Sequence, residues 1–93
     1  MFVGVLSVAF HIPESGSLKS KRRVVRCLKD KIRAHHNVSV SETGALDKWQ
    51  RAELGIACVG ADKKYINCTL SRIADTLNDF PDAYVIDLKM EIW

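Results

Sequence analysis

The chain has 93 residues, of which 47% are hydrophobic and 27% are charged, and its formal net charge is +3. This length suits one domain and excludes two independent cores. The composition excludes a disordered chain, and only three cysteines exclude a disulfide scaffold. We therefore expect a single folded domain over residues 1–93.

Residues 2–12 are rich in β-branched and aromatic side chains and predict a central strand. Gly4 and Ser7 interrupt this run, which is too short to span a bilayer. No basic residue precedes it and no small-residue cleavage site follows it, so we expect no signal peptide. The scattered cysteines, Cys27, Cys58 and Cys68, favour reduced thiols in a cytoplasmic protein.

A helix is predicted from Leu18 to about His36–Asn37. Residues 13–16 form a turn cluster, and Ser17 is well placed as the N-cap. Val25, Leu28 and Ile32 recur at helical spacing and mark the buried side. His35 and His36 end the helix, where a histidine interacts favourably with the last carbonyl groups.

Three further strands and one helix complete the pattern. Residues 38–41 predict a short strand, residues 42–48 a loop and residues 50–59 a second strong strand. Asp62 can cap a helix that closes with Phe80, and residues 84–92 alternate strictly as a last strand. The order β-α-β-β-α-β predicts an α+β, ferredoxin-like fold, with two helices on one face of a four-stranded antiparallel sheet.

The other face of this sheet has a small, aliphatic middle and charged edges. Its expected side chains are Val3, Val5, Ser7, Ala9, His11, Arg51, Glu53, Gly55, Ala57, Val59, Val85, Asp87, Lys89 and Glu91. A second copy of the chain is a candidate to cover it, although isolated exposed apolar residues are also ordinary. The central strands lack the aromatic residues on which RNA-recognition motifs stack bases.

The first helix concentrates the positive charge of the chain. Residues 19–33 contain eight of the 14 basic residues and one of the 11 acidic residues. Six of these basic residues fall within an arc of about 120° opposite the apolar seam, at 100° per residue. They are Lys19, Arg22, Arg23, Arg26, Lys29 and Arg33. A helix face of this kind suits phosphate groups, although a solvated face is the plain alternative.

Lys21 falls on the apolar side of the same helix, where an unpaired ammonium would be costly. One interpretation is that its stem lies along the core while the ammonium reaches water past the helix end. The other is an anion site formed by Ser15, Gly16, Ser17 and Lys21 at the helix N-terminus. Asp30 is expected to offset some charge on Arg26 and Arg33.

Enzyme signatures are weak. The three histidines form no metal-ligand motif, so we expect no metal and no cofactor. Acylphosphatases share the expected fold, but residues 13–17 contain no arginine to cradle a phosphate. We assign no catalytic residue. Trp49, between basic and acidic neighbours, is interpreted as an aromatic that packs at a hinge.

Several short motifs resemble the YlxP-like family of small bacterial proteins. They are Gly4-Val5-Leu6, residues 17–23 (SLKSKRR), residues 37–40 (NVSV), residues 47–50 (DKWQ) and Leu54-Gly55. The family pattern S-L-K-x-K-R falls on Ser17, Leu18, Lys19, Lys21 and Arg22. The resemblance implies a ferredoxin-like fold and no established activity. Its members are often encoded among translation and ribosome-maturation genes.

Two functions remain open from the sequence. The first is a non-enzymatic accessory protein that binds structured RNA, ribosomal RNA included, through Lys19, Lys21, Arg22, Arg23, Arg26, Lys29 and Arg33. The second is a homodimeric interaction module that uses the open sheet face, with the basic helix docking an acidic partner.

Overall fold

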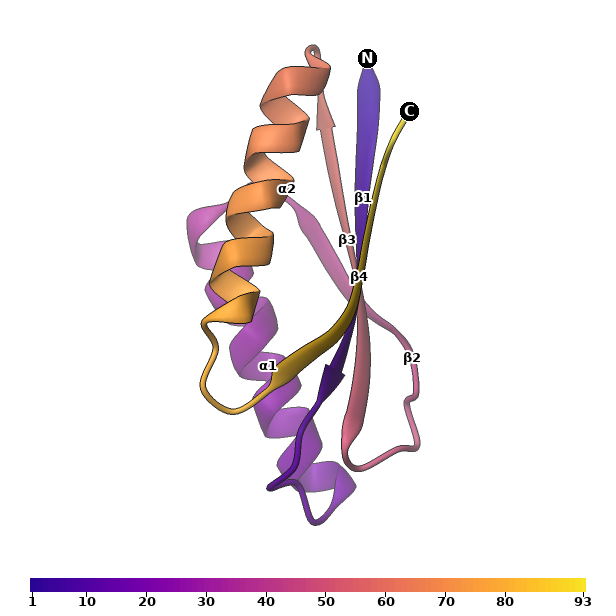
Figure 1. Cartoon of the computed structure of the whole chain (residues 1–93), viewed down its shortest axis with the longest axis vertical. Coiled ribbons are helices and arrows are strands. Elements are labelled where there is room, and N and C mark those ends of the chain that lie inside the picture. Colours follow the sequence, from indigo (N-terminus) through magenta and orange to yellow (C-terminus); the bar gives the residue numbers. More distant parts are fainter.

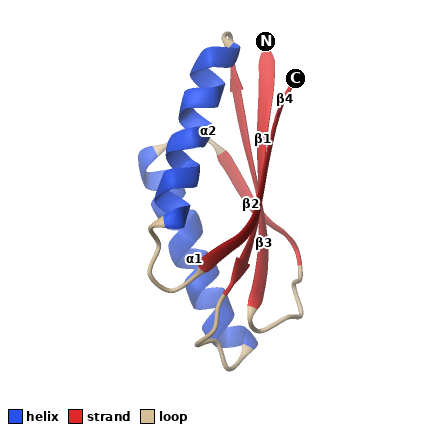
Figure 2. Ribbon diagram, viewed as in Figure 1, coloured by secondary structure: helices blue, strands red, loops and turns tan.

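The computed structural model describes residues 1–93 and consists of a sheet layer and a helix layer (Figure 1). The elements are β1 (Phe2–His11), α1 (Leu18–His35), β2 (Ser39–Gly44), β3 (Arg51–Gly60), α2 (Lys63–Asn78) and β4 (Tyr84–Ile92). Both helices lie on the same side of the strands (Figure 2). The ferredoxin-like fold predicted from the sequence is therefore confirmed.

The sheet has the strand order β2-β3-β1-β4, and every neighbouring pair is antiparallel. β1 and β3 are central and pair over their whole length, from Phe2 opposite Gly60 to His11 opposite Arg51. At one end, Val3 and Trp93 exchange two backbone hydrogen bonds of 2.8 Å. The two chain ends consequently lie side by side (Figure 1).

The core lies between the helices and one face of the sheet. α1 buries Val25, Leu28 and Ile32, at the helical spacing that the sequence predicted. The buried apolar residues of α2 are Ile66, Leu70, Ile73 and Leu77. Together with side chains from the strands, and with Ile12 and Ala83 from the loops, they form one cluster of 17 buried residues. A single core is what a chain of this length can support.

Both helices begin at the predicted N-caps. Ser17 Oγ accepts a hydrogen bond of 3.0 Å from the backbone N–H of Ser20, and a carboxylate oxygen of Asp62 accepts one of 2.9 Å from Lys64 N–H. These bonds satisfy N–H groups that the first helical turn leaves free. Neither helix is long and apolar enough to cross a membrane.

β2 is longer than the sequence predicted. It extends through Glu42 to Gly44, whereas residues 42–48 were expected to form a loop. Glu42 pairs with Leu54 of β3, two residues along from the pair of Val40 with Ile56. Because side chains alternate along a strand, Glu42 shares the helix-facing side with buried Val40. The longer strand thus carries a carboxylate beneath α1.

β4 contains a bulge that overturns its predicted strict alternation. Ala9 pairs with Asp87 but Phe10 pairs with Val85, so Ile86 has no partner in β1. A bulge residue shifts the orientation of the residues before it. Val85 therefore packs against the core instead of lying on the open face, whereas Tyr84 and Ile86 are 58% and 52% exposed.

We expect Gly4→Ala to destabilise the protein by about 1–3 kcal/mol, because a small-to-large change in a packed core forces neighbours apart. A Cβ atom at Gly4 would overlap Ile66 Cγ2 and lie 2.8 Å from Leu70 Cδ1. Urea unfolding followed by circular dichroism measures the change. Gly16→Ala is the matched control, because a Cβ there meets nothing within 4 Å. Equal stability of the two variants would contradict this account of the α2 contact.

Candidate nucleic-acid interface

The basic arc of α1 is presented to solvent. Five of its side chains are exposed and Lys29 is half-buried. The exposed five are Lys19, Arg22, Arg23, Arg26 and Arg33. None of the six lies within 4 Å of a carboxylate, and Asp30 forms no ion pair, contrary to the expectation that it offsets Arg26 and Arg33. The positive charge of this face is therefore not compensated at contact distance.

Arg33 also has a structural contact. Its Nη2 atom donates a hydrogen bond of 3.0 Å to the backbone carbonyl of Val40 on β2. β2 is an edge strand, and α1 lies against it. Arg33 thus ties the C-terminal half of α1 to the sheet, and the remaining five residues of the arc have no such bond. We call Lys19, Arg22, Arg23, Arg26 and Lys29 the basic face.

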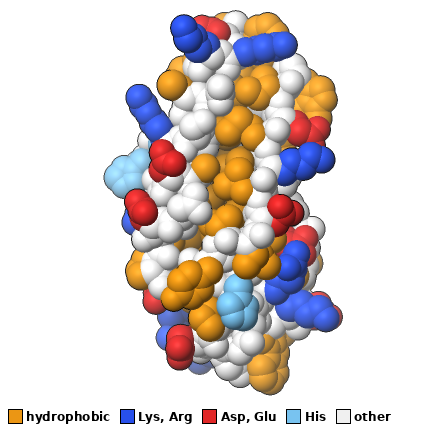
Figure 3. Space-filling view, viewed as in Figure 1, with side chains coloured by type: hydrophobic (Ala, Val, Ile, Leu, Met, Phe, Trp, Pro, Cys, Tyr) orange, Lys and Arg blue, Asp and Glu red, His pale blue; other side chains and the backbone are white.

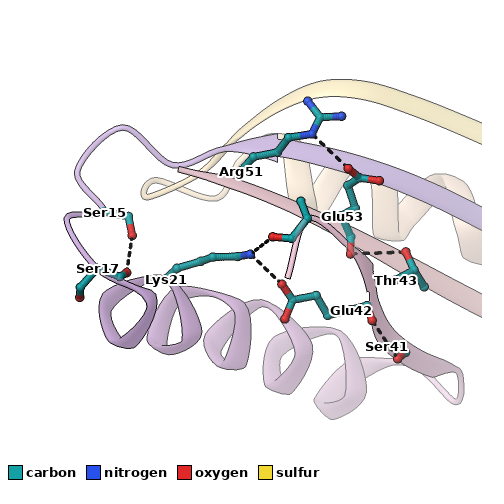
Figure 4. Close-up of polar contacts among 9 residues, drawn as sticks. Ser15, Ser17, Lys21, Ser41, Glu42, Thr43, Arg51 and Glu53 are labelled. Atoms are coloured by element: carbon teal, nitrogen blue, oxygen red, sulfur yellow. Dashed lines mark hydrogen bonds and ion pairs between the residues drawn. The ribbon is translucent and has the colours of Figure 1, made fainter. Parts of the chain in front are cut away.

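Lys21 is separate from the basic face. Its side chain is 1% exposed and points beneath α1, where Nζ lies 2.9 Å from Glu42 Oε2 and donates to the carbonyl of Ala45 (Figure 4). That Glu42 oxygen is buried and has no other donor. The ammonium does not reach water past the helix end, so that interpretation is wrong. Lys21 is a buried ion-pair partner.

The four residues of the predicted anion site do not converge. Ser15 is 2% exposed, and its Oγ donates to the carbonyl of Ser17 at 3.2 Å (Figure 4). Ser17 Oγ is occupied by the helix cap. Gly16 has no positive φ, so the turn does not need the conformational freedom of glycine. With Lys21 turned toward Glu42, the loop and the lysine serve different contacts.

The open sheet face differs from the prediction at its two ends. Its middle is small, as expected, with Ala57 opposite Val5 and Gly55 opposite Ser7. At one end Trp93 extends β4 beside Val3 and is 61% exposed. At the other end Trp49 is 54% exposed, so it does not pack at a hinge as the sequence suggested. The aromatic residues of this face therefore lie at its ends.

One histidine and one cysteine have pKa values shifted by their surroundings. Burial lowers the pKa of His36, with further lowering by the nearby charges of His35 and Arg72. The neutral imidazole is therefore favoured, although a helix C-terminus alone would favour the charged form. Burial also raises the pKa of the Cys58 thiol, which makes it a poor nucleophile. No three His, Cys, Asp or Glu side chains are grouped to hold a metal ion.

We expect Lys21→Met to lower the free energy of unfolding by about 3 kcal/mol, because it leaves a buried carboxylate without its partner. Lys19→Met, an exposed lysine on the same helix, should change stability by less than about 0.5 kcal/mol. The double variant Lys21→Met/Glu42→Leu should recover much of the loss. Urea unfolding tests all three variants. A Lys21→Met protein as stable as Lys19→Met would show that the ion pair contributes nothing.

Known proteins resemble this chain in sequence and in fold. Among solved structures, the de novo designed protein Foldit4 aligns over 100% of this chain and 97% of its own, with a TM-score of 0.57 and 14% identity. A putative chlorite dismutase aligns over 99% of this chain and 44% of its own, with a TM-score of 0.51 and 11% identity. At these identities the likeness concerns the fold alone.

Sequence relatives define the family. The uncharacterized protein YlxP of Bacillus subtilis (strain 168) is 37% identical over 71 residues, which are 76% of this chain and 77% of that protein. The model of a protein family of unknown function, DUF503, matches residues 3–90. The resemblance seen in the sequence motifs is thereby confirmed, and the chain belongs to the DUF503 family, which includes YlxP-like proteins.

Proposed function

We propose that this protein is a non-enzymatic accessory protein that binds structured RNA through the basic face of α1. The observation that carries the proposal is the absence of any carboxylate within 4 Å of Lys19, Arg22, Arg23, Arg26 or Lys29. Solvated helix faces usually mix charges of both signs. Five basic side chains without acidic partners attract an anionic polymer and gain from the release of its counterions.

The geometry of α1 supports backbone contacts in preference to base readout. From Lys19 to Lys29 the basic face extends along about 15 Å of helix axis, at 1.5 Å per residue. Arginine and lysine contacts to phosphates fix a protein on a nucleic acid without reading its sequence. The deep groove of an RNA duplex likewise favours recognition by shape and phosphates. We therefore assign structured RNA, with ribosomal RNA as the first to test.

A salt series with a hairpin RNA tests this proposal. Fluorescence anisotropy should show affinity falling with salt at a slope of about −0.7 to −0.9 per phosphate contact. Arg22→Ala/Arg26→Ala should weaken binding by about tenfold. The variant should also show a shallower dependence of affinity on salt, by the amount expected for the loss of about two phosphate contacts. Lys63→Ala/Lys64→Ala removes the same charge from exposed residues at the start of α2 and serves as the control.

Two outcomes would rule out this role for α1. One is binding that does not depend on salt concentration. The other is an equal loss of affinity in the α1 and α2 double variants, which would assign binding to net charge and not to the basic face.

The second candidate function is a homodimeric interaction module, and the apolar end of the open face favours it. Val59 and Trp93 are each 61% exposed, and both lie beside Val3. A second copy placed symmetrically on this face would bury the three side chains. The basic face of α1 would then remain free to dock an acidic protein.

Val59→Lys should convert such a dimer to a monomer, because the dimer would have to bury a charge. Analytical ultracentrifugation at high micromolar concentration measures the oligomeric state of the parent and the variant. Tyr65→Lys adds the same charge at an exposed position of α2 and should leave a dimer intact. A parent protein that sediments as a monomer would exclude this candidate.

A further inference from the structure

A surface cavity of about 570 Å³ lies at the end of the open face away from the chain termini. Its lining combines aromatic, basic and apolar side chains from three strands and a loop: His11, Lys48, Trp49, Gln50, Arg51 and Ile86. Figure 3, viewed toward the β4 edge of the sheet, shows a histidine next to hydrophobic side chains in its lower part, with basic side chains nearby. Neither the basic face nor the apolar end of the sheet includes this group.

Trp49 is the largest apolar side chain of the cavity and is 54% exposed. The loop that carries it is nevertheless held firmly. Lys21 Nζ and the backbone N–H of Lys48 both donate to the carbonyl of Ala45, and Gln50 Nε2 donates to the carbonyls of Pro13 and Ser15 at 3.3 Å. These bonds fix the backbone on which the exposed indole is carried, so only the side chain of Trp49 is left to be ordered when a flat ligand stacks on it.

The groups around Trp49 suit an aromatic ligand that carries negative charge. Lys48 is exposed and forms no ion pair. Arg51 donates to Glu53 through Nε alone, at 3.1 Å, so neither of its Nη nitrogens is engaged. Two cations next to an indole can bind a phosphate and a stacked base at the same time. The acidic Glu53 remains as an opposing charge beside Arg51.

The bulge in β4 completes the cavity. His11 lies between Arg51 of β3 and Tyr84 of β4, so three polar or aromatic side chains cross this end of the sheet. Ile86, the residue without a partner in β1, lines the cavity beside them. Bulges often re-aim a side chain next to a functional site. Here the bulge residue supplies a second apolar side chain to the cavity that Trp49 lines.

The cavity also adjoins the start of α1. Gln50 contacts the loop of residues 13–15 through its side chain, and its carbonyl accepts a hydrogen bond of 2.9 Å from Ile12 N–H. That loop leads directly into Ser17 and the first basic residues of α1. One RNA molecule can therefore contact the basic face and reach the cavity around the end of the domain.

We propose that the cavity binds an unpaired nucleotide of the RNA, with the base stacked on Trp49 and its phosphate on Lys48 and Arg51. This inference rests on the proposed RNA-binding function and adds a site for single-stranded RNA next to the contacts on structured RNA. Stacking on an aromatic side chain accepts any base, so the site selects unpaired nucleotides and not a sequence.

Two matched RNAs test the proposal: a blunt hairpin, and the same hairpin with an extension of four unpaired adenosines. The extension should raise affinity by about tenfold, within the range measured for base stacking on aromatic residues. In a Trp93→Phe background, where Trp49 is the only tryptophan, the extended hairpin should quench the indole emission and the blunt hairpin should not. Trp49→Leu should lose the affinity gain and bind the blunt hairpin as before.

Trp93→Leu is the matched control, since it removes the other exposed tryptophan, which lies at the opposite end of the sheet. It should keep the affinity gain. If the blunt hairpin binds with the expected salt dependence but the extension adds no affinity, the nucleotide site is wrong and the basic face stands. A Trp49→Leu protein that keeps the full affinity gain would likewise show that the nucleotide site is wrong while the basic face stands. If neither RNA binds, the RNA-binding function and the nucleotide site both fail.

Discussion

The buried ammonium of Lys21 is the constraint on which the arrangement of this domain depends. A lysine removed from water is tolerated only when its charge is paired and hydrogen-bonded. Glu42 supplies the charge and the carbonyl of Ala45 supplies the second acceptor. The three groups come from α1, β2 and the loop after β2. The two contacts of Lys21 therefore fix the helix and the loop relative to β2. Ala45 itself has a φ of 55°, a conformation that costs a non-glycine residue about 1–2 kcal/mol.

This constraint separates two kinds of basic residue within one helix. Lys21 and Arg33 are bound to groups of the domain itself and set how α1 lies on β2. The residues of the basic face have no such contacts, so their charge is directed outward. Both kinds lie in the same short segment, so a count of lysines and arginines cannot distinguish them. The distinction matters for mutagenesis, because Lys21 variants report on folding whereas Arg22 and Arg26 variants report on the surface.

Much of the fold could be predicted from periodicity and capping. Leu28 and Ile32 mark the buried side of α1, and Ser17 and Asp62 mark where the helices begin. The site was harder to predict because its parts are distant in sequence. The sequence predicts a loop at Glu42. Glu42 is nevertheless two residues after Val40, so it would face the same side if the strand continued, and this spacing is the signal that identifies the partner of Lys21. No sequence pattern predicts the exposure of Trp49, because that exposure depends on a loop held by hydrogen bonds to backbone carbonyls.

The bulge at Ile86 makes β4 tolerant of a change in length at one position. Elsewhere in the strand, loss of one residue would turn every preceding side chain to the opposite face, because the pleat has a period of two. Loss of Ile86 alone would leave Val85 opposite Phe10 and Asp87 opposite Ala9, in a regular ladder. Insertion or deletion at this point is thus a route by which related chains can gain or lose an apolar side chain of the cavity while the core keeps the same residues.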